Sequence, residues 1–275
     1  MGSADDRGLR LAELVAAFSL ATDLGLGQPM EHVLRAWRIS ARLGERIGLD
    51  DRARANLYYV ALLAWAGCVA DTYEVASWFG DDIAFRADSY EVDLAGLPML
   101  GFMLRHVGAG GPTLQRLRLA TTLVATGGQA VRRGLMSHCI STAQLADRLG
   151  LGPSVREPLK QMFTRWDGTG VPDGVGGEEI ALSIRLFHVG DIVEVFHHQR
   201  GIDAAREVAR ERRGKQFDPN VVDEFCRCAP EILEATDDDP DWLALIDCEP
   251  GLRHRLSEDE TDRALEAVAD FTDLR

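Results

Sequence analysis

Apolar residues recur at helical spacing along almost the whole chain, and this pattern limits the possible folds more than any other feature. Near the start of the chain they occupy positions i, i+3, i+4 and i+7, which lie on one face of a helix. Other helical spacings of three and four residues return later in the chain. The residues involved are Leu11, Leu14, Val15 and Phe18, then Ile39, Leu43 and Ile47, and then Leu186, Val189, Val193 and Phe196. No clear alternation of apolar and polar residues accompanies them, so the sequence predicts an all-α protein.

Turn and capping residues indicate where the predicted helices begin and end. Gly25 and Gly27 end the first helix, and Pro29 can open the second. The stretch 51–70 becomes apolar all round in its second half, which predicts one long central helix. No period persists over 80–97, where we expect an irregular connection.

Further helices are predicted in the second half of the chain. They cover 98–106, 114–125 and 129–149, and Ser154 is expected to cap a helix that runs to about Phe163. Asp218 and Pro219 open another helix that reaches about Cys228. Ser257 and Glu260 have the spacing of a capping box for the last helix, which should end near Leu274.

Charge and composition exclude several classes of protein. The 275 residues carry a net charge of −14, so a nucleic acid duplex is not expected as the main partner. The longest apolar run, 57–70, is too short to span a bilayer, and no membrane association is expected. The first residues lack the pattern of an export signal, and the five cysteines are odd in number and scattered. We therefore expect reduced thiols and a cytoplasmic protein.

A glycine-rich segment interrupts the helical pattern at 165–179. It reads RWDGTGVPDG from Arg165 to Gly174 and is followed by GGEEI from Gly176. Two later pieces accompany it in order: Asp191 in the next predicted helix, and GKQFDP from Gly214 to Pro219. These three motifs resemble, at the expected separations, the signature loop and later motifs of HD-GYP proteins.

The resemblance implies a fold, an activity and a division of the chain. HD-GYP domains are all-helical multi-helix bundles with a glycine-rich signature loop, and active members hydrolyse cyclic di-GMP at a centre of two or three metals. It implies a domain over 9–229, with N-terminal helices at 9–79, an irregular connection at 80–97, and a core at 98–229 that carries the loop 165–179. Residues 230–275 would form a helical extension or a joint to a following domain.

The residues that should bind metal in such a domain are largely replaced. The resemblance places the family's His-Asp pair at Ala64 and Trp65, and its lysine at Cys68. A methyl group has no lone pair and an indole N–H only donates, so neither Ala64 nor Trp65 can bind a hard divalent metal. The paired histidines before the loop correspond to Met162 and Phe163.

Only two candidate metal ligands remain, His138 and Asp191, and two are too few for a binuclear cluster. The family's early histidine is not evident near Gln28, and the offset of His32 does not fit. Each of these residues can also have a purely structural role. His138 can be a helix histidine with a satisfied hydrogen bond, and Asp191 can cap a helix or pair with Arg165 or Arg185. Trp65 can be a core residue, or its indole can fill the space of the former metals.

The loop also allows two interpretations. Its glycines permit positive φ and Asp167 can accept hydrogen bonds from turn amides, so structure alone can account for it. Alternatively, the loop and nearby arginines form a ligand or partner surface, in which arginines would meet phosphates. That surface would consist of Arg165, Trp166, Asp167, Gly168, Gly170, Val171, Pro172, Asp173, Arg185 and Arg200.

Three functions follow from the resemblance and its departures. The first is a non-catalytic regulatory or interaction module derived from a cyclic di-GMP phosphodiesterase, with no cofactor. The second is a metal-dependent phosphohydrolase with weak or altered activity, using Fe, Mn or a similar divalent metal. The third is a sensor that binds a cyclic dinucleotide without hydrolysis. In the family that the sequence resembles, similar degenerate halves stand at the start of longer actinobacterial chains, where an intact HD-GYP half and sometimes a LuxR-type helix-turn-helix follow. The expected partner is therefore a following HD-GYP domain, another protein or a second copy.

Overall fold

The computed structural model describes residues 8–126, 128–237 and 242–273, and within these ranges it contains helices and no strand. The predicted all-α class is confirmed. The α-helices are α1 (Leu11–Leu26), α2 (His32–Arg46), α3 (Asp51–Leu63), α4 (Cys68–Phe79), α5 (Asp82–Ser89), α6 (Gly96–His106), α7 (Thr113–Ala125), α8 (Gln129–Arg148), α9 (Pro153–Leu159), α10 (Leu182–Arg200), α11 (Ile202–Glu211), α12 (Pro219–Asp237), α13 (Trp242–Cys248) and α14 (Glu258–Thr272). Short 3-10 turns cover Gly177–Glu179 and Pro250–Leu252.

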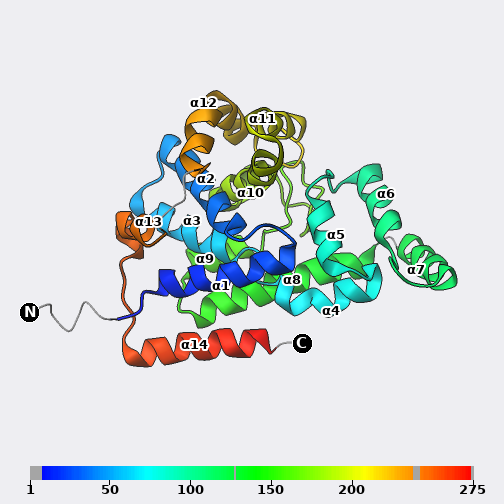
Figure 1. Ribbon diagram of the computed structural model, residues 1–275, viewed down its shortest axis with the longest axis horizontal. Coiled ribbons are helices and arrows are strands. Elements are labelled where there is room, and N and C mark those ends of the chain that lie inside the picture. Colours follow the sequence, from blue (N-terminus) through cyan, green and yellow to red (C-terminus); the bar gives the residue numbers. More distant parts are fainter. Residues whose placement is uncertain (1–7, 127, 238–241, 274–275) are drawn as a thin grey trace, which may run out of the picture.

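The central helix of the bundle is α10, which packs on α2 and α11 (Figure 1). Every residue of α10 from Leu186 to Phe196 is buried, so this helix has no solvent face over most of its length. Figure 1 shows α11 and α12 on one side of α10, and α1 and α14 on the other. The ring of Phe271 in α14 meets Phe18 of α1 edge-on, with centroids 6.2 Å apart.

A glycine allows α10 and α2 to approach closely. Gly190 lies in α10, and a Cβ atom there would be 2.6 Å from the backbone oxygen of Ala36 and 2.2 Å from Oγ of Ser40. Carbon atoms do not come that close to oxygen in a relaxed structure. The crossing of the two central helices therefore depends on a residue without a side chain at this position.

The predicted long helix over 51–70 is wrong. The chain leaves the helix at Leu63, makes a turn through Ala64–Gly67 with i to i+3 hydrogen bonds, and starts α4 at Cys68. Gly67 allows this turn to lie against α8, because a Cβ there would be 2.5 Å from Cγ of His138. The turn carries the partly buried Trp65, whose indole N–H donates to Asp191 of α10.

The expected irregular connection over 80–97 is also wrong, because it contains α5. Asp81 caps this helix by accepting a hydrogen bond from the Ala84 amide at 2.9 Å. The helix has only eight residues, and such a short helix needs tertiary contacts to be stable. One such contact is the stacking of Phe85 on Phe79, with ring centroids 3.9 Å apart.

Helix ends in the second half differ from the prediction in two places. α9 begins at Pro153 after Gly152, so Ser154 is inside the helix, and it ends at Leu159 instead of near Phe163. α12 continues past Cys228 to Asp237, with non-helical angles at Cys228 two residues before Pro230. The helix resumes after this kink, as expected where a proline removes one backbone donor.

Several caps agree with the sequence. Gly27 ends α1 in the left-handed conformation with φ of 65°, and Ser257 and Glu260 form both hydrogen bonds of a capping box. Asp218 accepts a hydrogen bond from the Asn220 amide at 2.8 Å at the start of α12. The first residues, 1–6, and Leu274, to which predictions were also attached, lie outside the described residues. Across the described part of the chain, no helix has both the length and the apolar character that a membrane span requires.

Candidate functional site

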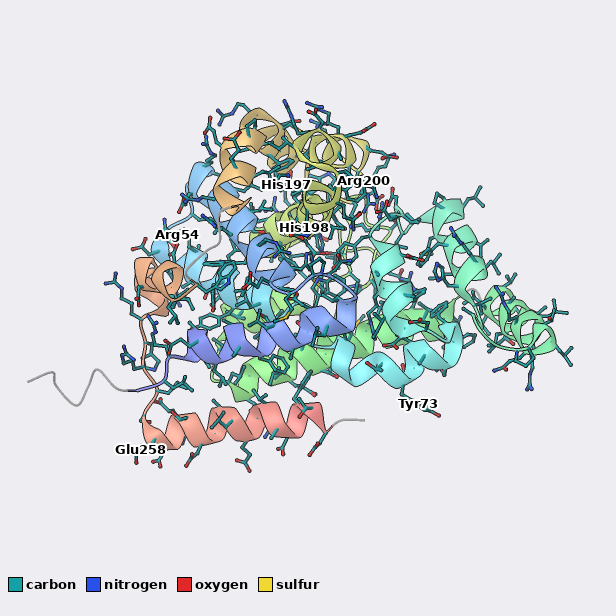
Figure 2. All side chains as sticks on the ribbon, in the orientation of Figure 1. Arg54, Tyr73, His197, His198, Arg200 and Glu258 are labelled. Atoms are coloured by element: carbon teal, nitrogen blue, oxygen red, sulfur yellow. The ribbon has the colours of Figure 1, made fainter. Side chains whose placement is uncertain are left out.

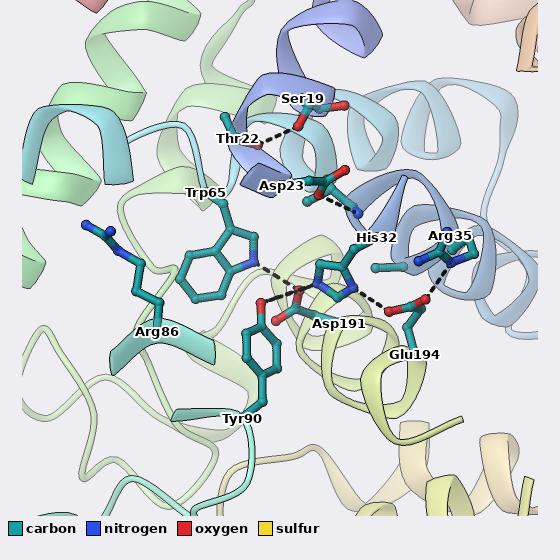
Figure 3. A network of polar contacts seen from close by, with 12 residues as sticks. Ser19, Thr22, Asp23, His32, Arg35, Trp65, Arg86, Tyr90, Asp191 and Glu194 are labelled. Carbon is teal, nitrogen blue, oxygen red and sulfur yellow. Dashed lines mark hydrogen bonds and ion pairs between the residues drawn. The ribbon is translucent and has the colours of Figure 1, made fainter. Parts of the chain in front are cut away.

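Asp191 of α10 lies at the centre of a buried polar network. Its Oδ1 accepts hydrogen bonds from the indole Nε1 of Trp65 at 2.9 Å and from Nε2 of His32 at 3.1 Å (Figure 3). Trp65 comes from the turn after α3 and His32 from the first residue of α2, while Tyr90, at the end of α5, lies beside them. Four separate segments of the chain therefore meet at one carboxylate.

His32 links this carboxylate to a second one. Its Nδ1 forms a hydrogen bond with Oε2 of Glu194, which lies one helical turn after Asp191 in α10. Burial lowers the pKa of His32, but the carboxylates of Glu194 and Asp191 outweigh burial and raise it to about 10. The ring is therefore an imidazolium near neutral pH, and both of its nitrogens donate.

Arg35 completes the charge balance of the network. Its Nε donates to Oε1 of Glu194 at 2.5 Å. Burial raises the pKa of Glu194, but His32 and Arg35 outweigh burial, so this pKa lies below its ordinary value. Two cations, Arg35 and His32, thus face two anions, Glu194 and Asp191.

Asp23 is a buried carboxylate beside this network. Its Oδ1 accepts a hydrogen bond from the Val33 amide at 3.1 Å, whereas its Oδ2 is buried without a hydrogen-bond partner in the described structure. Burial outweighs the attraction of His32 and raises the pKa of Asp23 to about 6.

This raised pKa predicts a pH dependence of stability. Because the folded state holds the Asp23 proton more tightly than the unfolded state, the contribution of Asp23 to stability rises as the pH falls through 6. Between pH 7 and pH 4, the wild type should gain on the order of 2 kcal/mol relative to Asp23→Asn. Urea unfolding of both proteins at the two pH values measures this. A difference that does not change with pH would contradict the assignment.

The two remaining metal-ligand candidates, His138 and Asp191, both lie next to Trp65. The His138 ring is 6.1 Å from the Trp65 ring between centroids, and its Nε2 is bonded to the backbone oxygen of Ala64 at 2.8 Å. Asp191 receives the indole N–H of the same tryptophan. Phe163 lies next to both rings, with its ring centroid 6.0 Å from that of Trp65 and 5.0 Å from that of His138.

The suggested pairing of Asp191 with Arg165 or Arg185 is wrong. Arg165 binds Asp93 at 2.6 Å and Asp167 at 3.2 Å, and Arg185 binds Asp218 at 2.7 Å. Both arginines therefore have other carboxylate partners, while Asp191 faces His32 and Trp65.

Sequence reasoning missed His32 and Glu194. The offset of His32 from the expected position argued against it, yet it lies on the same buried face as Ala36, Ile39 and Leu43 of α2. Glu194 interrupts an apolar run in α10, between Val193 and Val195. A histidine on the apolar face of one helix and a lone carboxylate inside another apolar helix were the signals that could have identified the pair.

The signature loop is held by contacts within the protein. The amides of Trp166 and Asp167 donate to the backbone oxygens of Gln216 and Lys215, at 3.1 and 2.9 Å, so two of the recognised motifs contact each other. Asp167 accepts from the Thr169 amide at 3.0 Å. Gly168 has φ of 74°, and at Gly170 a Cβ atom would lie 2.4 Å from the backbone oxygen of Phe163.

The other proposed surface residues are also engaged. Asp173 is ion-paired with Arg132, and the guanidinium of Arg185 lies over the Trp166 ring at 5.9 Å. Arg200, at the end of α10 (Figure 2), is ion-paired with Glu91 and lies over the ring of Phe196 at 4.8 Å. Carboxylates thus neutralise all three arginines that were proposed to meet phosphates.

A cavity of about 310 Å³ opens beside Trp65. Its walls are mostly apolar and come from α5, α6, α8 and the signature loop. The replaced positions Trp65, Cys68, Met162 and Phe163 all line it, as do His138, Asp191, Gly170 and Val171. The cavity therefore joins the residual ligand candidates to the loop.

The donor set at this site does not fit a binuclear metal centre. Ala64 offers a methyl group, and Trp65 offers an N–H that is already given to Asp191. Met162 is a soft ligand and Phe163 has no donor atom. Within residues 8–126, 128–237 and 242–273, no group of three or more His, Cys, Asp or Glu side chains is arranged to hold a metal ion.

Known proteins that are similar to this chain in fold or sequence include cyclic dinucleotide phosphodiesterases. The solved structure of a cyclic GMP-AMP specific phosphodiesterase from V. cholerae, V-cGAP3, matches with a TM-score of 0.74 and 19% identity. The match covers 97% of this chain and 61% of that one. The chain has the fold of this phosphodiesterase.

Sequence comparisons agree with this fold. The chain is 24% identical over 235 residues to 3'3'-cGAMP-specific phosphodiesterase 3 of Vibrio cholerae, a match that covers 85% of this chain and 49% of the relative. A shorter region is 38% identical over 69 residues to the cyclic di-GMP phosphodiesterase response regulator RpfG of Xanthomonas campestris, covering 23% of this chain and 18% of that protein. No family model matches. The relatives support an HD-GYP-like domain, and the chain spans about half the length of the first of them.

Proposed function

We propose that this domain is a non-catalytic regulatory module built on the fold of cyclic dinucleotide phosphodiesterases. The observation that carries the proposal is the hydrogen bond that the Trp65 indole donates to Asp191. Trp65 stands where the resemblance places a metal-binding aspartate. A metal ligand must offer a lone pair, and Trp65 offers a donor in its place.

The second donor on Asp191 supports the same conclusion. His32 is held as an imidazolium between Asp191 and Glu194, so it too donates to the carboxylate. A cation entering the site would have to displace a fixed N–H and lie near a buried positive charge. Asp191 thus serves a packed polar network in which its charge is already compensated.

We further propose that the module acts through a protein partner in the cytoplasm, either an HD-GYP domain or a second copy of the chain. Non-catalytic binding of a cyclic dinucleotide is a competing function, because the relatives are named for cyclic dinucleotide substrates. Weak metal-dependent hydrolysis is the third candidate function.

Metal analysis combined with an activity assay tests the proposal. The purified chain, incubated with Mn²⁺ or Fe²⁺ and desalted, should retain much less than one metal ion per chain. It should not hydrolyse cyclic di-GMP or 3'3'-cGAMP above the level of the Asp191→Asn variant, which serves as the control for contaminating enzymes. One or two bound metals together with turnover that requires Asp191 would overturn the proposal. A thermal shift with either dinucleotide and no turnover would favour the sensor.

A further inference from the structure

The cavity beside Trp65 has walls suited to an apolar molecule. Its lining includes Phe102 of α6, Leu135 of α8, and Met162, Phe163 and Val171 near the loop. Aromatic rings and methionine side chains adapt to apolar ligands of varied shape. A volume of about 310 Å³ lies at the small end of the range for ligand pockets, which is about 300–1,000 Å³.

Four arginines line the same cavity, and three of them have carboxylate partners. Arg86 is ion-paired with Asp82, Arg132 with Asp173, and Arg165 with Asp93 and Asp167. These pairs leave little positive charge for a ligand, because each guanidinium is already matched by a carboxylate.

Arg212 is the exception among these four arginines. Its guanidinium donates to the backbone oxygen of Tyr90 at 2.6 Å and to Oε1 of Gln216 at 3.2 Å, both of them neutral acceptors. No carboxylate in the described structure lies within ion-pair distance of it, and the residue is only 3% exposed. Burial lowers the pKa of Arg212, although Asp93, Glu211 and Glu91 act against this from a greater distance. A buried cation that has only neutral partners is stabilised by an anion that reaches it.

From these two observations we infer that the cavity binds a small amphipathic molecule with one anionic group, such as a medium-chain carboxylate. The apolar body lies against the walls named above, and the anionic group meets Arg212. The inference deepens the proposed function and rests on it, because it names the class of ligand that the module would sense.

The remaining charges around the cavity agree with a single anion. Asp191 lines the cavity, but the imidazolium of His32 compensates its carboxylate. His188 also lines it, and burial lowers the pKa of this histidine, which is bonded to the Met162 backbone oxygen at 2.8 Å. A cyclic dinucleotide carries two phosphates, and only one arginine of the four lacks a carboxylate partner.

Calorimetric titration of the full chain with three probes, each built on a ten-carbon chain, tests the inference. Decanoate, decanol and decyltrimethylammonium share an alkyl chain and differ in charge, and each is used below its micelle concentration. Decanoate should bind about tenfold more tightly than decanol, because a hydrogen bond to a charged group raises affinity by about that factor or more. The cation should bind least. Equal affinities for decanoate and decanol, or no binding of either, would overturn the inference.

Two variants locate the site, and one serves as a matched control. Arg212→Gln should remove the preference for decanoate over decanol, whereas Arg213→Gln, an exposed neighbour paired with Asp223, should keep it. Val131→Trp places a large side chain in the cavity lining and should abolish binding of both probes. Unchanged decanoate binding in a folded Val131→Trp or Arg212→Gln protein would contradict the site. If Arg212→Gln does not fold, the probe series on the wild type still decides.

The metal and hydrolysis assays keep this test separate from the proposed function. Failure of decanoate to bind, in a chain that neither holds metal nor hydrolyses cyclic dinucleotides, would refute only the ligand. Hydrolysis that requires Asp191 would refute the proposed function itself.

Discussion

Replacing His32 with alanine is expected to lower the free energy of unfolding by about 3–5 kcal/mol. The imidazolium is fully buried and donates to two buried carboxylates, Asp191 and Glu194. Removing it leaves Asp191 with Trp65 as its main donor and Glu194 with Arg35, so two anions lose a shared counterion. Chemical denaturation near pH 7 measures the loss.

His198→Ala is the matched control for this variant. His198 is an exposed residue at the end of α10, and removing its side chain should change stability by no more than about 0.5 kcal/mol. The loss in His32→Ala should also shrink as the pH rises from 6.5 to about 10, because over this range the folded wild type holds a proton on His32 that the unfolded chain has released. A His32→Ala protein as stable as His198→Ala would show that the buried network is not held by this charge.

The second large effect is expected at Gly190. Gly190→Ala should destabilise the protein by about 2–3 kcal/mol, because the added methyl group would overlap the backbone oxygen of Ala36 in α2. Ser40 can turn its hydroxyl away, but a helix carbonyl cannot move without separating α2 from α10. The midpoint of thermal or urea unfolding measures the change.

The same substitution at Gly101 should have the opposite sign. Gly101 is an exposed position in α6 with nothing within 4 Å of an added Cβ. Alanine is favoured over glycine in a helix interior by about 0.5–1 kcal/mol, so Gly101→Ala should be slightly stabilising. If both variants were stabilising, α2 and α10 would not pack as closely as the structure has them.

Helices and caps that rest on local signals could be predicted from the sequence. The capping box of Ser257 and Glu260 and the left-handed Gly27 each satisfy backbone groups within a few residues. The resemblance also drew attention to residues that lie together in the structure, since Trp65, Met162, Phe163 and Asp191 all line one cavity. The role of each residue there depends on tertiary contacts, which cannot be read from positions along the sequence.

The break at Leu63 shows where local reasoning stops. The residues from Ala64 to Ala66 have no strong helix breaker, and Gly67 alone was compatible with a continuous helix. The turn is stabilised by distant partners. His138 forms a hydrogen bond with the backbone oxygen of Ala64, and Asp191 accepts a hydrogen bond from Trp65, which is 126 residues away along the chain. Helix α5 also depends on tertiary structure. Its cap is a local signal, but the stacking of Phe85 on Phe79 follows from how two helices pack.

The chemistry of the site divides in the same way. The residue types at Ala64 and Trp65 are enough to show that these two side chains are not ligands for a hard metal, because the presence of a lone pair is a property of the side chain itself. The charge of His32 and the neutral hydrogen-bond acceptors of Arg212 depend on which groups lie within about 3 Å. Those groups come from α10, from the end of α5 and from the loop between α11 and α12. Periodicity and capping act over one or two turns of chain, whereas burial and ion pairing act through space. Only the packing of α2 on α10 could bring His32 to a carboxylate 159 residues away.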